Sequence, residues 1–142
     1  MKDYQKLKWS KQGHLHNVWE LSFADEDGKN VRVSIFEVET ARDINGSQVI
    51  EEIQRALNMK EEWVRKIGED LASVSKEWEG AGKDFRKMDT SDLLDIFQLN
   101  SILLDSQHQL TALYFDTTCF AGHQVVLEFN EAGKPFEAEI TG

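Results

Sequence analysis

Apolar and polar residues alternate in four short runs at the end of the chain, and residues that favour turns separate these runs. The runs are Gln98–Asp105, Leu110–Asp116, His123–Asn130 and Phe136–Thr141. Alternation with a period of two predicts β-strands, and short breaks that contain Asp, Asn, Gly or Ser predict tight connections. This part of the sequence therefore predicts a four-stranded antiparallel meander.

The last two of these strands also predict their own pairing. The expected partners are Phe129 with Phe136, Leu127 with Ala138, and Val125 with Ile140. This register makes one face of the hairpin apolar, whereas a shift by one residue would place a glutamate opposite each apolar side chain. Burial of the apolar face therefore selects the register.

A second hairpin is predicted near the start of the chain, with strands over His14–Phe23 and Val31–Val38. The sequence ADEDGKN between them, Ala24–Asn30, holds the Asp and Gly residues that tight turns favour. The expected partners are Phe23 with Val31, Leu21 with Val33, and Trp19 with Ile35. The pattern leaves open whether this hairpin joins the later strands.

The apolar spacing changes from two to about 3.6 residues between the hairpin and the meander, which predicts helices. A first helix is indicated by Val49, Ile50, Ile53, Ala56 and Leu57. A second is expected to begin at a capping box of Asn58 and Glu61 and to stop at Gly80 and Gly82. Its apolar residues, which predict one buried stripe, are Trp63, Ile67, Leu71, Val74 and Trp78. A single bent helix over Ser47–Glu79 is the alternative.

A short third helix, capped by Asp89 or Thr90, is expected to end near Ile96. Together these elements predict an α+β fold. Its mostly antiparallel sheet would contain about six strands, and two or three helices from the middle of the chain would pack on one face. The sequence has no internal repeat and no long linker, so a single domain over residues 1–142 is expected.

The excess of acidic over basic side chains limits the classes of partner that the protein is expected to bind. The 142 residues include 26 acidic and 16 basic side chains, which gives a formal net charge of −10. Nucleic acids and anionic membranes would repel such a protein, so neither is expected as a partner, whereas a basic protein would be attracted. No run approaches the roughly 18 consecutive apolar residues that indicate a membrane-spanning helix.

Cys119 is the only cysteine, so an intramolecular disulfide is excluded. The polar start of the chain, Met1–Ser10, lacks the apolar segment of a signal peptide. Both features favour the cytoplasm. Cys119 could act as a nucleophile with His123 as its base, but no catalytic signature surrounds it, so an ordinary structural cysteine is the favoured interpretation.

Three short motifs follow one another near the end of the chain. They are Leu113-Tyr114-Phe115-Asp116, then Phe120-Ala121-Gly122-His123, then the closing Ile140-Thr141-Gly142, after a helical stretch that ends near Trp78. This series resembles a bacterial domain-of-unknown-function family, and the likeness covers about Leu57–Gly142. The resemblance implies a small bacterial cytoplasmic protein and no particular activity. In size and charge, acidic α+β domains of this kind resemble immunity proteins of toxin systems.

Two histidines in the first predicted strand are candidate zinc ligands. His14 and His16 are two residues apart and so share one face of the strand, and His123 could supply a third ligand. No further Cys or His follows at a ligand-like spacing. Exposed histidines on an edge strand are therefore the favoured interpretation, and neither a metal nor another cofactor is expected.

The motif Phe120-Ala121-Gly122-His123 is a candidate binding site at a strand end. The alternation places His123 on the core side of its strand, so its imidazole is expected to be half-buried, with Asp116 as a candidate hydrogen-bond partner. A histidine that stabilises this connection, with Gly122 allowing a tight backbone, is favoured over a catalytic or ligand-binding histidine.

Three glutamates gather on the polar face of the last hairpin. The predicted register places Glu128 opposite Glu137, with Glu139 on the same face. Like charges opposed across a strand pair destabilise it, and a basic partner would relieve the repulsion. A catalytic carboxylate pair is disfavoured because an open sheet face offers no pocket. A plain solvated face is the simplest alternative.

These features favour a non-enzymatic, acidic protein-binding module of a bacterial cytoplasm, such as an immunity or inhibitor protein. The candidate binding residues are Phe120, Gly122, His123, Glu128, Glu137 and Glu139. One alternative is a small hydrolase or metal-dependent enzyme that uses His123 with His14 and His16. Another is a structural accessory protein, or a homodimer joined through an open strand edge.

Overall fold

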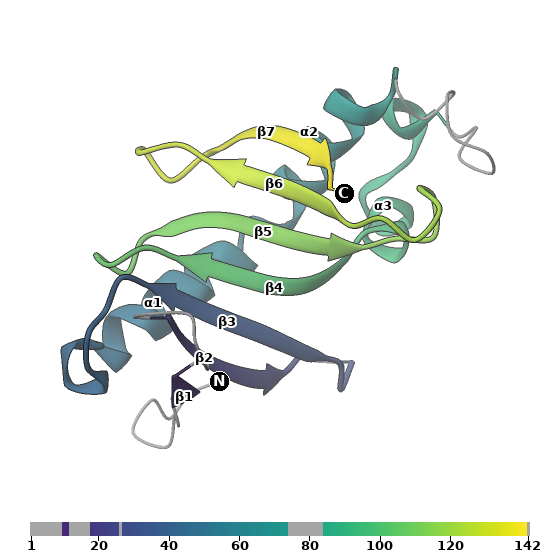
Figure 1. The fold of residues 1–142 in the computed structure, drawn as a ribbon. Coiled ribbons are helices and arrows are strands. Elements are labelled where there is room, and N and C mark those ends of the chain that lie inside the picture. Colours follow the sequence, from purple (N-terminus) through teal and green to yellow (C-terminus); the bar gives the residue numbers. More distant parts are fainter. Residues whose placement is uncertain (1–9, 12–17, 26, 74–83, 142) are drawn as a thin grey trace. The chain divides into compact units, whose positions relative to one another are not determined.

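The computed structural model describes residues 10–11, 18–25, 27–73 and 84–141. Its strands are β1 (Ser10–Lys11), β2 (Val18–Ala24), β3 (Asn30–Phe36), β4 (Gln98–Leu104), β5 (Leu110–Asp116), β6 (Val125–Phe129) and β7 (Pro135–Ile140). Its helices are α1 (Gly46–Leu57), α2 (Lys60–Leu71) and α3 (Thr90–Ile96), with short 3₁₀ helices at Ala41–Asp43 and Phe85–Lys87. The predicted α+β fold is confirmed (Figure 1).

The strands are hydrogen-bonded in sequence order from β1 to β7. The pairs β1–β2, β2–β3, β5–β6 and β6–β7 are antiparallel, which confirms a mostly antiparallel sheet. The exception is β3, which runs parallel to β4 over Ser101–Leu104. This parallel pair joins the N-terminal hairpin to the later strands, the point that the sequence pattern left open.

The chain forms two compact units, and it passes between them at three points. Unit 1 consists of residues 1–58 and 101–111, and unit 2 of residues 59–100 and 112–142. Each unit has buried apolar side chains from both helix and strand.

In unit 1 the predicted hairpin register is confirmed, with Leu21 opposite Val33 and Phe23 opposite Val31. The buried side chains of β3 are Val31, Val33 and Ile35, and those of α1 are Val49, Ile50, Ile53 and Ala56. The helix begins after Asn45, whose side chain accepts a hydrogen bond from the Gln48 N–H group. A side-chain acceptor at this position satisfies one of the free N–H groups at a helix start.

Unit 2 is built around the buried face of α2. Trp63, Ile67 and Leu71 are buried, so the described part of the predicted stripe is confirmed, while Val74 and Trp78 lie outside the described residues. The Trp63 ring meets Phe115 of β5 edge-on at 5.7 Å between centroids. Helix α3 begins after Asp89, which caps it by accepting from the Asp92 N–H group, as predicted.

The predicted capping box of Asn58 and Glu61 is wrong. Asn58 ends α1 instead, because its N–H group still bonds to the carbonyls of Gln54 and Ala56. Met59 precedes α2 without a side-chain cap, and α2 ends at Leu71, earlier than expected. The interpretation with two helices is therefore the correct one, and Gly80 and Gly82 lie outside the described residues.

The predicted pairing of Phe129 with Phe136 is also wrong, although the register beyond it is confirmed. Leu127 lies opposite Ala138, but Phe129 lies opposite Pro135, with an irregularity in the ladder beside Glu128. Proline has no N–H group to donate, so prolines in sheets occur at edges and bulges. Phe136 is the extra residue of this bulge and is 48% exposed rather than buried.

Candidate functional site

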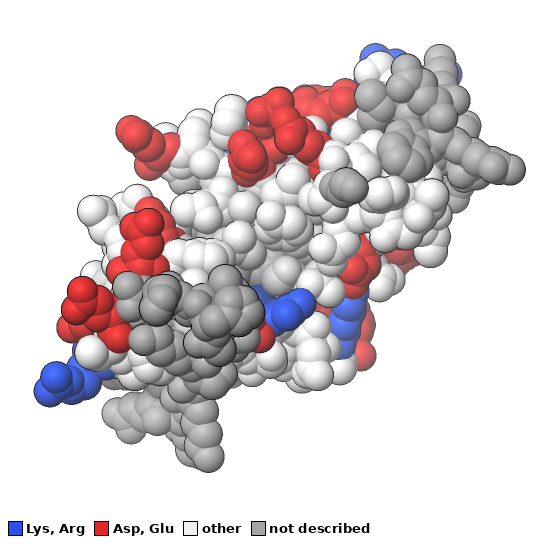
Figure 2. All heavy atoms as spheres, in the orientation of Figure 1, with Lys and Arg blue, Asp and Glu red and all other residues white. Residues whose placement is uncertain are grey.

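Acidic side chains converge where β7 meets α2 in unit 2. The register places Glu128 directly opposite Glu137, as predicted, and Glu139 opposite Val126. Helix α2, which packs against β7, adds Asp70. We call Asp70, Glu128, Glu137 and Glu139 the acidic surface. Figure 2 shows red acidic side chains gathered over β7.

Two carboxylates of this surface raise the pKa of Glu137. The charge of Glu139 and a hydrogen bond with Glu139 are the main causes that raise the pKa of Glu137 above its usual 4.5, and Asp70 adds to the effect. Lys66 opposes it, and its Nζ lies 3.1 Å from an Asp70 oxygen. Repulsion among carboxylates therefore exceeds the compensation from the nearby lysine.

Asp70 has a second role at the edge of the strand. Its Oδ2 accepts a hydrogen bond of 2.9 Å from the Ala138 N–H group. This group points away from β6, because Ala138 faces Leu127 at a position where ladder bonds are absent. Helix α2 therefore satisfies an edge N–H group that could otherwise pair with another chain.

Phe136 places an apolar ring beside these charges. It lines a shallow hollow of about 380 Å³ together with Lys66, Asp70, Glu137 and Ala138. Among the described residues it is the one large apolar side chain that is exposed. A lysine or arginine from a partner could lay its apolar stem, or its charged group, on the ring while facing the carboxylates.

The connection before β6 holds three of the other predicted site residues. Phe120 is buried, with its ring 6.3 Å from that of Phe85. Its carbonyl accepts from the His123 N–H group, and Gly122 has a φ of 87°. The His123 Nδ1 lies 2.8 Å from the Thr141 carbonyl, which can only accept, so Nδ1 donates. These contacts describe a histidine that fixes a loop, and its role in binding stays a prediction.

Asp116, the predicted partner of His123, accepts hydrogen bonds from two amide side chains. Asn100 Nδ2 lies 3.1 Å from one carboxylate oxygen, and Gln124 Nε2 lies 2.9 Å from the other. The Cys119 side chain is buried at 3% exposure, which shields its thiol from a substrate.

The predicted zinc ligands His14 and His16 lie outside the described residues. Within residues 10–11, 18–25, 27–73 and 84–141, no three His, Cys, Asp or Glu side chains are placed to hold a metal ion.

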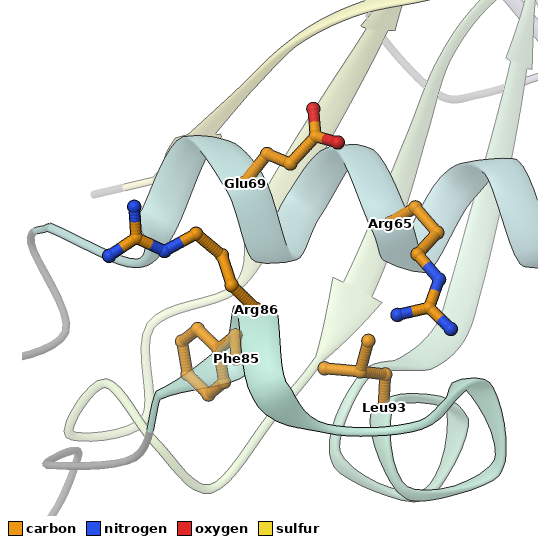
Figure 3. Close-up of a pocket in the computed structure, with 5 residues that line it drawn as sticks. All are labelled: Arg65, Glu69, Phe85, Arg86 and Leu93. Atoms are coloured by element: carbon orange, nitrogen blue, oxygen red, sulfur yellow. The ribbon is translucent and has the colours of Figure 1, made fainter.

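A second hollow in unit 2, of about 290 Å³, is lined by Arg65, Glu69, Phe85, Arg86 and Leu93 (Figure 3). The two guanidinium groups point to opposite sides, and Glu69 points away from the hollow. Arg65 donates to the Met88 carbonyl and to Thr90 Oγ1, both at 3.1 Å. The arginines therefore do not converge on one point as an anion site would require, and Arg65 fixes the start of α3.

Sequence patterns missed two residues of the acidic surface and its surroundings. Asp70 and Lys66 are an i, i+4 pair on a helix, which usually indicates a solvated ion pair. The hydrogen bond between Asp70 and Ala138 joins residues 68 positions apart and has no local signal. His108 is a further buried polar residue that the patterns did not single out.

Comparisons with known proteins give no match to a family model, to a curated protein or to a solved structure. Among the residues that the structure describes, no helix has the length and apolar character needed to cross a membrane.

Proposed function

We propose that the protein is a non-enzymatic protein-binding module of a bacterial cytoplasm, an inhibitor or immunity protein, and that its acidic surface binds a basic protein partner. The observation that carries this proposal is the meeting of unrelieved negative charge with an exposed aromatic ring. The pKa of Glu137 is raised chiefly by Glu139, and Phe136 lies in the same hollow.

The two features support the proposal together. Crowded carboxylates alone fit a solvated face, and one exposed phenylalanine alone is unremarkable on a protein surface. Side by side, they provide an apolar contact and a local excess of negative charge, and aromatic and charged groups combine in this way at many binding interfaces. A basic partner would relieve the repulsion that the free protein carries.

The contact between α2 and β7 argues against the alternative of a homodimer joined through β7. Asp70 already bonds to the Ala138 N–H group, so this position is not open to a strand from a second copy. The binding surface is therefore proposed to act through its side chains rather than through strand addition.

The proposal is tested by capture from a native bacterial lysate with the tagged protein as bait. The surface variant combines Phe136→Ser, Glu137→Gln and Glu139→Gln. Its control combines Glu61→Gln and Glu131→Gln, which removes two exposed charges that do not line the hollow at Phe136. We expect wild type and control to capture the same basic protein and the surface variant to lose it. Capture of one partner by all three, or of none, would contradict the proposal.

A further inference from the structure

Three hairpin turns in the chain share one hydrogen-bond pattern over five residues: Asp25–Lys29, Asp105–Gln109 and Asn130–Lys134. In each, the first N–H group donates to the fifth carbonyl, at 2.8, 2.9 and 2.9 Å. The fourth N–H group donates to the first carbonyl, at 3.0, 2.9 and 2.9 Å. The fifth N–H group donates to the side-chain oxygen of the first residue, at 2.9, 3.0 and 3.0 Å.

The fourth residue of each turn has a left-handed backbone, and here one turn differs from the others. Gly28 and Gly133 occupy this position in two turns, with φ of 79° and 75°. The third turn has His108, with φ of 67°. Glycine adopts this conformation freely, whereas a side chain disfavours it, so a histidine here indicates that its side chain has a role.

The His108 side chain connects its turn to the start of α1. It is 8% exposed, and its Nε2 accepts a hydrogen bond of 2.8 Å from the Asn45 N–H group. Asn45 in turn caps α1 through its side chain, which accepts from Gln48 and Ser47, and its carbonyl accepts from the Val49 N–H group. One imidazole therefore fixes the residue that organises the first turn of the helix.

This bond requires one protonation state. Nε2 can accept only through its lone pair, so the imidazole is neutral and Nδ1 carries the proton. A protonated imidazole would present an N–H group to the Asn45 N–H group, and two donors cannot bond to each other.

We propose that the His108–Asn45 bond is a proton-controlled contact, closed when His108 is neutral and open when it is protonated, so that acid loosens the start of α1. The contact belongs to unit 1, whereas the acidic surface belongs to unit 2.

The charged groups around His108 include carboxylates that could accept a hydrogen bond from a protonated imidazole. From α1, Glu51, Glu52 and Arg55 line the same hollow of about 300 Å³ as His108. Arg55 donates to Glu52, and Glu51 lines the same hollow as a second α1 carboxylate. On its own turn, the Asp105 side chain accepts from the Gln107 and Gln109 N–H groups. Before Asn45, Asp43 accepts from the Thr40 hydroxyl. A protonated His108 is therefore expected to turn from Asn45 toward Glu51 and Glu52.

The test is amide hydrogen exchange and NMR titration of the full chain from about pH 8 to about pH 5, the range in which histidines change charge. The protection of the Asn45 amide is its measured exchange rate relative to the intrinsic rate at each pH. We expect this protection to fall by about tenfold in the wild type, the effect of losing one buried hydrogen bond. The fall should share its midpoint with the titration of the His108 ring protons, while the Ile53 amide stays protected.

Variants separate the contact from general effects of acid. In His108→Gln the amide oxygen can accept at every pH, so Asn45 protection should not depend on pH. In His108→Gly the turn keeps its backbone and loses the acceptor, so protection should be low throughout. The control is His123→Gln, because His123 donates to a carbonyl and can do so in both charge states. The control should keep the wild-type transition.

Two results would overturn the proposal. One is Asn45 protection in the wild type that stays constant while His108 titrates, a measurement that needs no variant. The other is a transition at Asn45 that persists in His108→Gly.

Discussion

At the scale of single residues, the sequence and the structure give different causes for the repulsion at the Glu137 carboxylate. The sequence predicts repulsion from Glu128, and the structure does place Glu128 opposite. However, the pKa of Glu137 is raised chiefly by the charge of Glu139 and by a hydrogen bond with Glu139 on the same strand, then by burial, and then by the charge of Asp70 on α2. The electrostatic repulsion on Glu137 therefore comes from a cluster of carboxylates and not from one cross-strand pair.

The raised pKa of Glu137 predicts a pH-dependent effect of Glu137→Gln on the free protein. Folding favours the neutral carboxyl of Glu137. Its contribution to the free energy of unfolding is therefore present below the usual pKa of 4.5 and is lost as pH rises through the raised pKa. The variant is neutral at every pH. We expect it to have a slightly higher Tm than the wild type at about pH 7, and the difference to vanish near about pH 4. Thermal unfolding at both pH values measures this.

The matched control for this experiment is Glu131→Gln, in the exposed turn between β6 and β7. It removes the same charge from a position outside the acidic surface. A gain in Tm at neutral pH that is equal in both variants would reflect net charge alone, and the special position of Glu137 would be refuted.

At the scale of secondary structure, the main feature is the way α2 covers the edge of β7. The helix satisfies the Ala138 N–H group through Asp70 and keeps Lys66 beside the same carboxylate. The acidic surface is therefore held by two elements, and its geometry depends on how α2 packs.

Asp70→Ala is expected to destabilise the protein by about 1–3 kcal/mol, because it leaves an edge N–H group without its partner. Asp70→Asn keeps an oxygen that can accept this bond, and it should cost less than the alanine variant. Urea unfolding of both variants gives the comparison. Equal losses would show that the charge, and not the hydrogen bond, is what stabilises this edge.

Leu71 tests the packing of α2 itself. Its side chain is 3% exposed, so Leu71→Ala should cost about 2–5 kcal/mol, as for other buried leucines. The control is Glu69→Ala on the exposed side of the same helix, expected within about 0.5 kcal/mol of wild type. A similarly small loss for Leu71→Ala would mean that the end of α2 is not packed as the structure shows.

At the scale of the whole molecule, the sequence predicts those features of the fold that depend on residues close together in the chain. The register of β2 with β3 follows from alternation across one short turn, and the start of α3 follows from the two adjacent capping candidates Asp89 and Thr90, of which Asp89 is the cap. The parallel pairing of β3 with β4 joins strands that lie far apart in the sequence, Asn30–Phe36 and Gln98–Leu104, so no short-range pattern indicates it. The bulge at Phe136 was missed because the alternation of apolar residues outweighed the signal of Pro135.

The candidate site shows the same limit. Glu128, Glu137 and Glu139 were identified because one strand pair brings them together. Asp70 and His108 were not, because each makes its decisive contact with a residue more than sixty positions away. Side chains that join distant segments become visible only when the fold is known.

The proposed binding function is tested most directly by the kinetics of association with the captured partner. Association rates of wild type, Glu137→Gln and Glu131→Gln would be measured at low and at moderate salt. We predict that Glu137→Gln associates more slowly and with a shallower salt dependence, since charges at an interface steer association, while Glu131→Gln behaves as wild type. A partner whose association is indifferent to both salt and Glu137→Gln would show that the acidic surface is only solvated.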